Sequence, residues 1–187
     1  MDEKNSLITI SGPPASGTST IAGQLSDKLN FEHISGGDIF RTMAEERNIS
    51  LAELTEEAEH NASIDKQLDS RLKNVIDEYA NGDYEVDGNG LIVESRLSGW
   101  HALDDATVSV YLNAPPEIRV NRITGREETV RELEEREDSE AQRYKNYYNI
   151  DINDLEIYDL VIDTYENSPQ YVVKQIENKL NEKKLEF

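Results

Sequence analysis

A glycine-bracketed nonapeptide near the N-terminus has the residue types of a loop that binds phosphate. It consists of Gly12, Pro13, Pro14, Ala15, Ser16, Gly17, Thr18, Ser19 and Thr20. The two glycines allow a tight turn whose backbone N–H groups surround phosphate oxygens, and a helix N-terminus behind the turn adds partial positive charge. Ser19 stands where the hydroxyl of such a loop binds Mg²⁺.

One position departs from the usual form of this loop, G-x-x-x-x-G-K-[ST]. Thr18 occupies the place of the lysine whose ammonium neutralises charge on the β- and γ-phosphates. In an active enzyme, another cation has to supply that charge. A loop that has lost its activity, or a plain glycine turn between a strand and a helix, also fits these nine residues.

Arginines elsewhere in the chain are candidates for the missing charge. Six of the ten lie in one stretch: Arg119, Arg122, Arg126, Arg131, Arg136 and Arg143. The first three have the spacing of one helix face, and the last two share another face with Glu140. Guanidinium groups bind phosphate through paired N–H donors. Salt bridges to the many neighbouring glutamates are the structural alternative for two or three of the six.

Alternating strand and helix signals position these residues. Short apolar runs predict strands at 7–11, 31–35, 91–93, 107–112 and 159–162. Helical spacing follows at 21–29, 36–47, 51–61 and 64–79, and Pro116 and Pro169 open two further helices. The turn-rich segment 81–90 predicts a surface loop or hairpin around a short strand. We therefore expect an α/β fold, a P-loop NTPase-type three-layer sandwich with a mainly parallel five-stranded sheet and helices on both faces.

The predicted sheet gathers three polar segments at one edge. The nonapeptide, the turn at 36–38 and the segment 94–96 each follow a strand. Ligands of such sheets bind beyond the carboxyl ends of the strands, so these segments are expected to form one site.

Composition limits the class of protein. A chain of 187 residues fits one domain, and the absence of cysteine excludes disulfides and thiolate metal sites. No apolar run approaches the ~20 residues that span a bilayer, and the N-terminus lacks a signal-peptide pattern. The three histidines have no metal-ligand spacing. We expect a soluble, cytoplasmic protein without a membrane partner.

The net charge of −20 is extreme for a chain of this length. It disfavours nucleic acid as a partner, because a polyanion is repelled. Apolar periodicity runs nearly from end to end, which argues against a disordered acidic chain. Acidic residues along helix faces and a low lysine content favour a solvated acidic surface on a folded core, as in halophilic proteins.

Four segments together resemble the nucleoside monophosphate kinase family, and most of all its archaeal-type cytidylate kinases. They are residues 11–20, 35–41, 93–96 and 136–143. The similarity extends from Leu7 to about residue 180. Archaeal members of that family also tend to have threonine in place of the loop lysine, so Thr18 agrees with the resemblance.

The resemblance implies a role for each matching segment. Residues 12–20 would bind ATP, with Mg²⁺ on Ser19. The side of the site that takes CMP would use Gly36, Gly37, Asp38, Arg41, Arg96, Arg136, Glu140 and Arg143. Within it, Arg41 and Arg96 would grip the acceptor phosphate. Arg122 and Arg126 would stand at the root of a lid over the donor phosphates. The residues expected to act in catalysis are Arg96, Arg122, Arg126 and Arg143.

The resemblance also implies an organisation and a reaction. Residues 1–187 would form a single kinase domain with a helical insertion that binds the nucleoside monophosphate at about 36–80 and a short lid at about 122–132. A monomer would transfer the ATP γ-phosphoryl group to CMP, and to dCMP, giving CDP and ADP for the CMP reaction. An adenylate- or shikimate-type kinase, a non-catalytic nucleotide-binding module and a protein recruited through its acidic surface remain alternatives.

Overall fold

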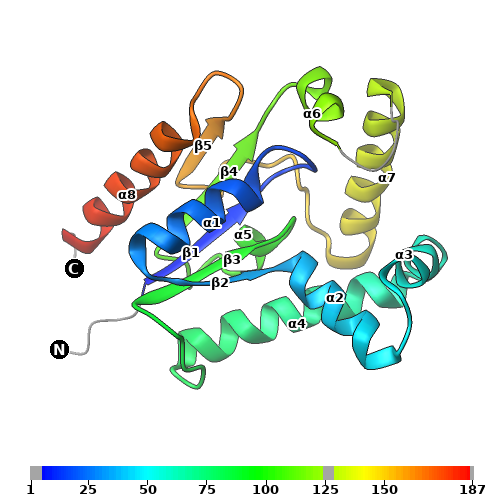
Figure 1. Cartoon of the computed structure of the whole chain (residues 1–187), viewed down its shortest axis with the longest axis horizontal. Helices are drawn as coiled ribbons and strands as arrows, with labels where there is room; N and C mark the ends of the chain where they lie inside the picture. Colours follow the sequence, from blue (N-terminus) through cyan, green and yellow to red (C-terminus); the bar gives the residue numbers. More distant parts are fainter. Residues whose placement is uncertain (1–5, 124–128, 186–187) are drawn as a thin grey trace.

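Five parallel strands form one sheet in the described part of the chain (Figure 1). The computed structural model describes residues 6–123 and 129–185. The sheet order is β2-β3-β1-β4-β5, and the strands are β1 Ser6–Ser11, β2 Glu32–Ser35, β3 Gly90–Glu94, β4 Val108–Asn113 and β5 Leu160–Asp163. Each of these strands begins and ends within one residue of the bounds predicted for it, and neighbouring strands pair in parallel. The predicted parallel α/β sheet is therefore confirmed.

Helices connect the strands of the sheet. Their bounds are α1 Thr18–Leu29, α2 Gly36–Arg47, α3 Leu51–His60, α4 Ala62–Asn81, α5 Ser98–His101, α6 Pro116–Arg122, α7 Val130–Tyr148 and α8 Pro169–Leu185. The described segment 82–89 contains no strand and is a loop, which is the first of the two alternatives predicted for it. Helix α6, which carries Arg119 and Arg122 of the predicted arginine face, ends at Arg122 because Ile123 is extended, at φ −69° and ψ 124°.

Apolar residues of the strands point alternately to two faces of the sheet. On one face, strand residues such as Ile10 and Ile92 pack against Leu25 of α1 and Ile176 of α8. On the other face, Leu91 and Val93 of β3 belong to a cluster with Leu72 and Ile76 of α4. The chain is therefore a three-layer sandwich, as the period-two patterns of its strands predict.

Helices α2, α3 and α4 have a small core of their own. Met43, Ala44, Leu54 and Ile64 are buried there against one another. Ser50 begins α3 with a capping box, because its hydroxyl accepts from the Glu53 N–H while the Glu53 carboxylate accepts from the Ser50 N–H. Figure 1 shows these three helices together beyond the β2 side of the sheet. Residues 36–81 thus form a helical unit where the sequence predicts an insertion.

Acidic side chains cover the exposed faces of the helices, as Glu53, Glu56 and Glu57 of α3 illustrate. With a net charge of −20, we expect the melting temperature to rise with KCl into the molar range. The reason is screening, which shortens the Debye length from about 30 Å at 0.01 M to about 3 Å at 1 M. A series of thermal melts in KCl measures this. A curve that is flat above ~0.2 M would indicate an ordinary acidic protein.

Among the helices of residues 6–123 and 129–185, none is long and apolar enough to cross a membrane.

Candidate active site

The loop between β1 and α1 has the backbone geometry of the predicted phosphate-binding turn. A Cβ atom on Gly12 would lie 2.3 Å from the carbonyl oxygen of Leu112, so only glycine fits there. Gly17 adopts φ 97°, a left-handed conformation that other residues rarely take. It directly precedes α1, whose first N–H groups consequently face the loop. The requirement for Gly17 is a local backbone conformation, whereas the requirement for Gly12 comes from its neighbour Leu112 in β4.

Both hydroxyls at the start of α1 are bound to one buried carboxylate. Thr18 Oγ1 donates to Glu94 Oε1 at 2.5 Å, and Ser19 Oγ donates to the same oxygen at 2.9 Å. Burial raises the pKa of the Glu94 carboxyl, but interactions with His33, Thr18 and Ser19 outweigh it and leave that pKa below its ordinary value. Sequence reasoning placed Glu94 at a strand end and gave it no role. Its position at the end of a central strand was the available signal.

Arg96, just beyond β3, is held by a carboxylate of α7. Its Nε and Nη2 atoms lie 2.8 Å and 2.6 Å from Glu140 Oε2. Tyr144 donates to Glu140 Oε1 at 3.3 Å. Burial disfavours the charged guanidinium, but the Glu140 charge outweighs it and raises the pKa of Arg96. Two residues of the predicted CMP side, Arg96 and Glu140, are thus brought together, and Arg96 stays cationic.

The turn that begins α2 carries an ion pair between Arg41 and Asp38. Helix spacing also places Glu45 four residues after Arg41, but the partner that Arg41 takes is Asp38, three residues before it. Ser35 caps α2 by accepting from the Asp38 N–H at 3.0 Å, and its hydroxyl donates to the Asp38 carboxylate at 2.6 Å. The hydrogen bond from Ser35 is the main cause that lowers the pKa of Asp38. Arg41 is half exposed.

Arg143 of α7 faces α4. Its Nε lies 3.7 Å from Asp65 Oδ2, and its Nη1 donates to Ser139 at 3.3 Å. Burial raises the pKa of Asp65, and the Arg143 charge opposes that shift. Tyr148 joins the same two helices by donating to Asp69 at 2.9 Å. Arg136 lies on α7 one helical turn before Glu140.

Arg122 lines a pocket beside the phosphate loop. Its guanidinium donates to the hydroxyl and the carbonyl of Thr164 at 3.0 Å and 3.2 Å, and to the carbonyl of Ala15 at 3.4 Å. The pocket has a volume of about 250 Å³, and its lining is Gly17, Thr20, Ile21, Arg122, Thr164, Asn167, Pro169 and Val172. Arg126, the other predicted lid arginine, lies outside the described residues.

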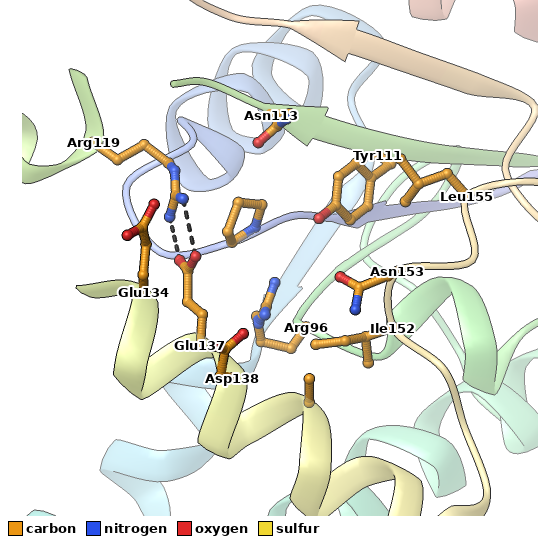
Figure 2. A pocket seen from close by; sticks show the side chains of 12 residues that line it. Arg96, Tyr111, Asn113, Arg119, Glu134, Glu137, Asp138, Ile152, Asn153 and Leu155 are labelled. Carbon is orange, nitrogen blue, oxygen red and sulfur yellow. Dashed lines mark hydrogen bonds and ion pairs between the residues drawn. The ribbon is translucent and has the colours of Figure 1, made fainter. Parts of the chain in front are cut away.

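The pocket in Figure 2, with a volume of about 290 Å³, lies between the phosphate loop, β4, α7 and the segment 152–155. Arg119 reaches toward it from α6 but is only 4% exposed. Its guanidinium pairs with both oxygens of Glu137, as the dashed lines show, and its Nε donates to the carbonyl of Ala114 at 2.9 Å. Arg119, and Arg131 with Glu135, thus form salt bridges of the kind that the structural alternative predicts. Arg96 and Pro13 line the same pocket, which places Arg96 at the loop.

Within the described part of the chain, no group of three or more carboxylate or imidazole side chains could hold a metal ion by itself. The residues present nevertheless fit Mg²⁺, which usually takes few protein ligands and completes its shell with water and phosphate oxygens. Ser19 gives its proton to Glu94 and so keeps oxygen lone pairs for a cation.

Known proteins resemble this chain over most of its length. The model of the Cytidylate kinase-like family matches residues 7–166. A cytidylate kinase of Halobacterium salinarum is 47% identical over 171 residues, which cover 89% of this chain and 84% of the relative. One of Sulfurisphaera tokodaii is 41% identical over 180 residues, covering 94% and 95%. Shikimate kinase from Aquifex aeolicus, 19% identical with a TM-score of 0.59 over 96% of this chain and 98% of its own, shares the fold. The chain belongs to the cytidylate kinase-like family.

Proposed function

We propose that this protein is an ATP-dependent cytidylate kinase, a phosphotransferase that converts CMP to CDP and forms ADP. The observation that carries the proposal is the 41–47% identity to archaeal cytidylate kinases over about nine-tenths of the chain. The site agrees with it, because a partly buried arginine cation at a strand end lines one pocket with the phosphate loop. dCMP is the proposed second acceptor.

The donor side is assigned to the loop at 12–20 and the pocket beside Arg122. Backbone N–H groups of the loop bind the ATP phosphates, and the base occupies the pocket between Ile21, Val172 and Asn167. Ser19 is the proposed ligand of Mg²⁺, which when bound neutralises charge on the donor oxygens. Thr18 cannot replace the lysine charge, because a hydroxyl is neutral; it donates its proton to Glu94 instead. Arg122, which already contacts the loop carbonyl of Ala15, supplies that charge.

The acceptor phosphate is assigned to Arg96 and Arg41. Glu140 engages the Nε and Nη2 atoms of Arg96, which leaves Nη1 to donate to a phosphate oxygen. Arg41 is half exposed on the first turns of α2 and can exchange Asp38 for the phosphate. Two guanidinium groups hold a phosphate in a fixed orientation, which in-line transfer requires.

Recognition of the cytosine base is assigned to Arg143 and Asp65. The sequence pointed to Glu140 as the acceptor of the cytosine amino group, but its carboxylate is engaged by Arg96 and Tyr144. Asp65 is half buried, and Arg143 lies 3.7 Å away. A carboxylate accepts from the amino group while a guanidinium donates to the ring carbonyl. On this assignment the helical unit at 36–80 binds the acceptor, and residues 122–132 act as the lid.

We expect CMP to be phosphorylated at least ~10-fold more efficiently than AMP or UMP, which corresponds to about 1.4 kcal/mol. Uracil lacks the amino group from which Asp65 would accept a hydrogen bond, and a purine presents a different arrangement of hydrogen-bond donors and acceptors. A coupled assay with a panel of monophosphates measures kcat/KM for each. Asp65→Asn should reduce the ratio of kcat/KM for CMP to kcat/KM for UMP. Asp77 is an exposed carboxylate of the same helix that pairs with Lys73, and Asp77→Asn should leave that ratio unchanged.

The same assay separates the alternatives. Equal or better turnover of AMP would contradict the cytidylate assignment and favour an adenylate-type kinase. Turnover of shikimate in place of nucleotides would favour a shikimate-type kinase, whose similarity here extends to the fold. ATP binding without transfer to any acceptor would identify a non-catalytic nucleotide-binding module.

A further inference from the structure

His33 and Glu94 face each other behind the phosphate loop. The register of β2 and β3 pairs His33 with Ile92 and Ser35 with Glu94, so both side chains point to the face of the sheet that α1 covers. His33 Nε2 lies 3.6 Å from Glu94 Oε2. Both atoms are buried, and neither has a hydrogen-bond partner among the described residues. Two unsatisfied polar atoms therefore meet at one point.

Buried polar atoms in folded proteins are nearly always hydrogen-bonded, so such a pair calls for an explanation. A displacement of about 0.7 Å would bring the two atoms to the usual distance of about 2.9 Å. The other oxygen of Glu94 is already fully engaged, because it accepts from both Thr18 and Ser19. A donor on Oε2 would fix the rotation of the carboxylate and thereby the direction of both hydroxyls.

We propose that His33 is a positioning residue of the phosphoryl-transfer site, acting through Glu94 to orient the Ser19 hydroxyl. Its Nε2–H donates to Glu94 Oε2, which holds Oε1 under the loop. The Ser19 hydroxyl then donates its hydrogen bond to Glu94, and its lone pairs face the cation site. The loop has Thr18 in place of lysine, so the alignment of its hydroxyls matters more than in a loop with its own ammonium. This inference rests on the proposed use of ATP with Mg²⁺.

Three substitutions test the role of the His33 donor. His33→Leu removes the donor at similar size, His33→Gln places an amide N–H near the same point, and His33→Asn is polar but too short to reach. Removing such an outer partner typically lowers metal affinity 10- to 100-fold. We expect His33→Leu and His33→Asn to raise the Mg²⁺ concentration for half-maximal ATP binding about 10-fold, and His33→Gln to stay within about threefold of wild type.

Calorimetric titration of ATP at stepped Mg²⁺ concentrations measures the effect without turnover. The KM for CMP should change less than about twofold in all three variants, because the acceptor side is untouched. In a Glu94→Gln background, His33→Leu should have no further effect, since His33 acts through that carboxylate. His60→Leu, at an exposed histidine of α3, is the control.

Several results would overturn the proposal. These are an unchanged Mg²⁺ requirement in His33→Leu, equal losses for CMP and for ATP with Mg²⁺, and a His33→Gln variant no better than His33→Asn. If His33→Leu fails to fold, the Mg²⁺ requirements of His33→Gln and His33→Asn are compared, and this comparison decides whether the donor at position 33 matters. Wild-type protein that binds no ATP in the presence of Mg²⁺ would refute the proposed function, and this inference with it.

Discussion

Arg96→Ala is expected to lower kcat/KM for CMP at least 30-fold in a coupled assay. Arg96 is partly buried just beyond the end of β3, and its Nη1 atom is left to donate toward the site. Removing a phosphate contact in a site sheltered from water leaves the acceptor charge underneutralised, at a cost of about 2–5 kcal/mol in the transition state. Because about 1.4 kcal/mol corresponds to one factor of ten, the low end of that range already gives the stated loss.

Arg96→Ala is also expected to lower the stability of the protein, and this effect has to be distinguished from the loss of the phosphate contact. Without Arg96, the Glu140 carboxylate stays partly buried with only Tyr144 as a described partner, which is destabilising. The double variant Arg96→Ala with Glu140→Gln should recover the melting temperature without recovering activity. Arg71→Ala removes an exposed arginine pair with Glu46 and should leave kcat/KM unchanged. Near-wild-type activity in Arg96→Ala would mean that the acceptor phosphate binds elsewhere.

Ser19→Ala is expected to abolish most Mg²⁺-dependent activity, with a loss of kcat/KM of about 100-fold. The substitution removes the only hydroxyl we assign to the cation. Thr18 is beside it but points its hydroxyl to the same Glu94 oxygen, and we give it no role on the metal. The measurement is turnover of CMP against Mg²⁺ concentration, together with the affinity for ATP.

A matched control exists on another helix. Ser63 is the second residue of α4, as Ser19 is of α1, and it is exposed. Ser63→Ala should leave turnover and its Mg²⁺ dependence intact. Ser19→Ala with an unaltered Mg²⁺ dependence would remove the loop hydroxyl from the cation site, even if the protein remained an active kinase.

Local signals in the sequence determined the sheet, most helix starts and the phosphate loop. Gly12 and Gly17 are needed for reasons that lie within a few residues or at one close backbone contact, and strand periodicity reflects which face is buried. Four short segments sufficed to predict the family. The end of α6 escaped prediction, because apolar and arginine spacing continued past Arg122 although the backbone turned extended at Ile123.

The partners of Glu94, Arg96 and Arg119 were decided by the tertiary structure. Glu94 meets Thr18 from 76 residues away, and Arg96 meets Glu140 from 44 residues away. Arg119 of α6 meets the partly buried Glu137 of α7. The Asp38 partner of Arg41, by contrast, is local, three residues before it in α2. An ion pair depends on which strands and helices become neighbours, and the burial that makes it strong arises only when the layers pack. That is why the sequence named the cations of this site and the fold selected their carboxylates.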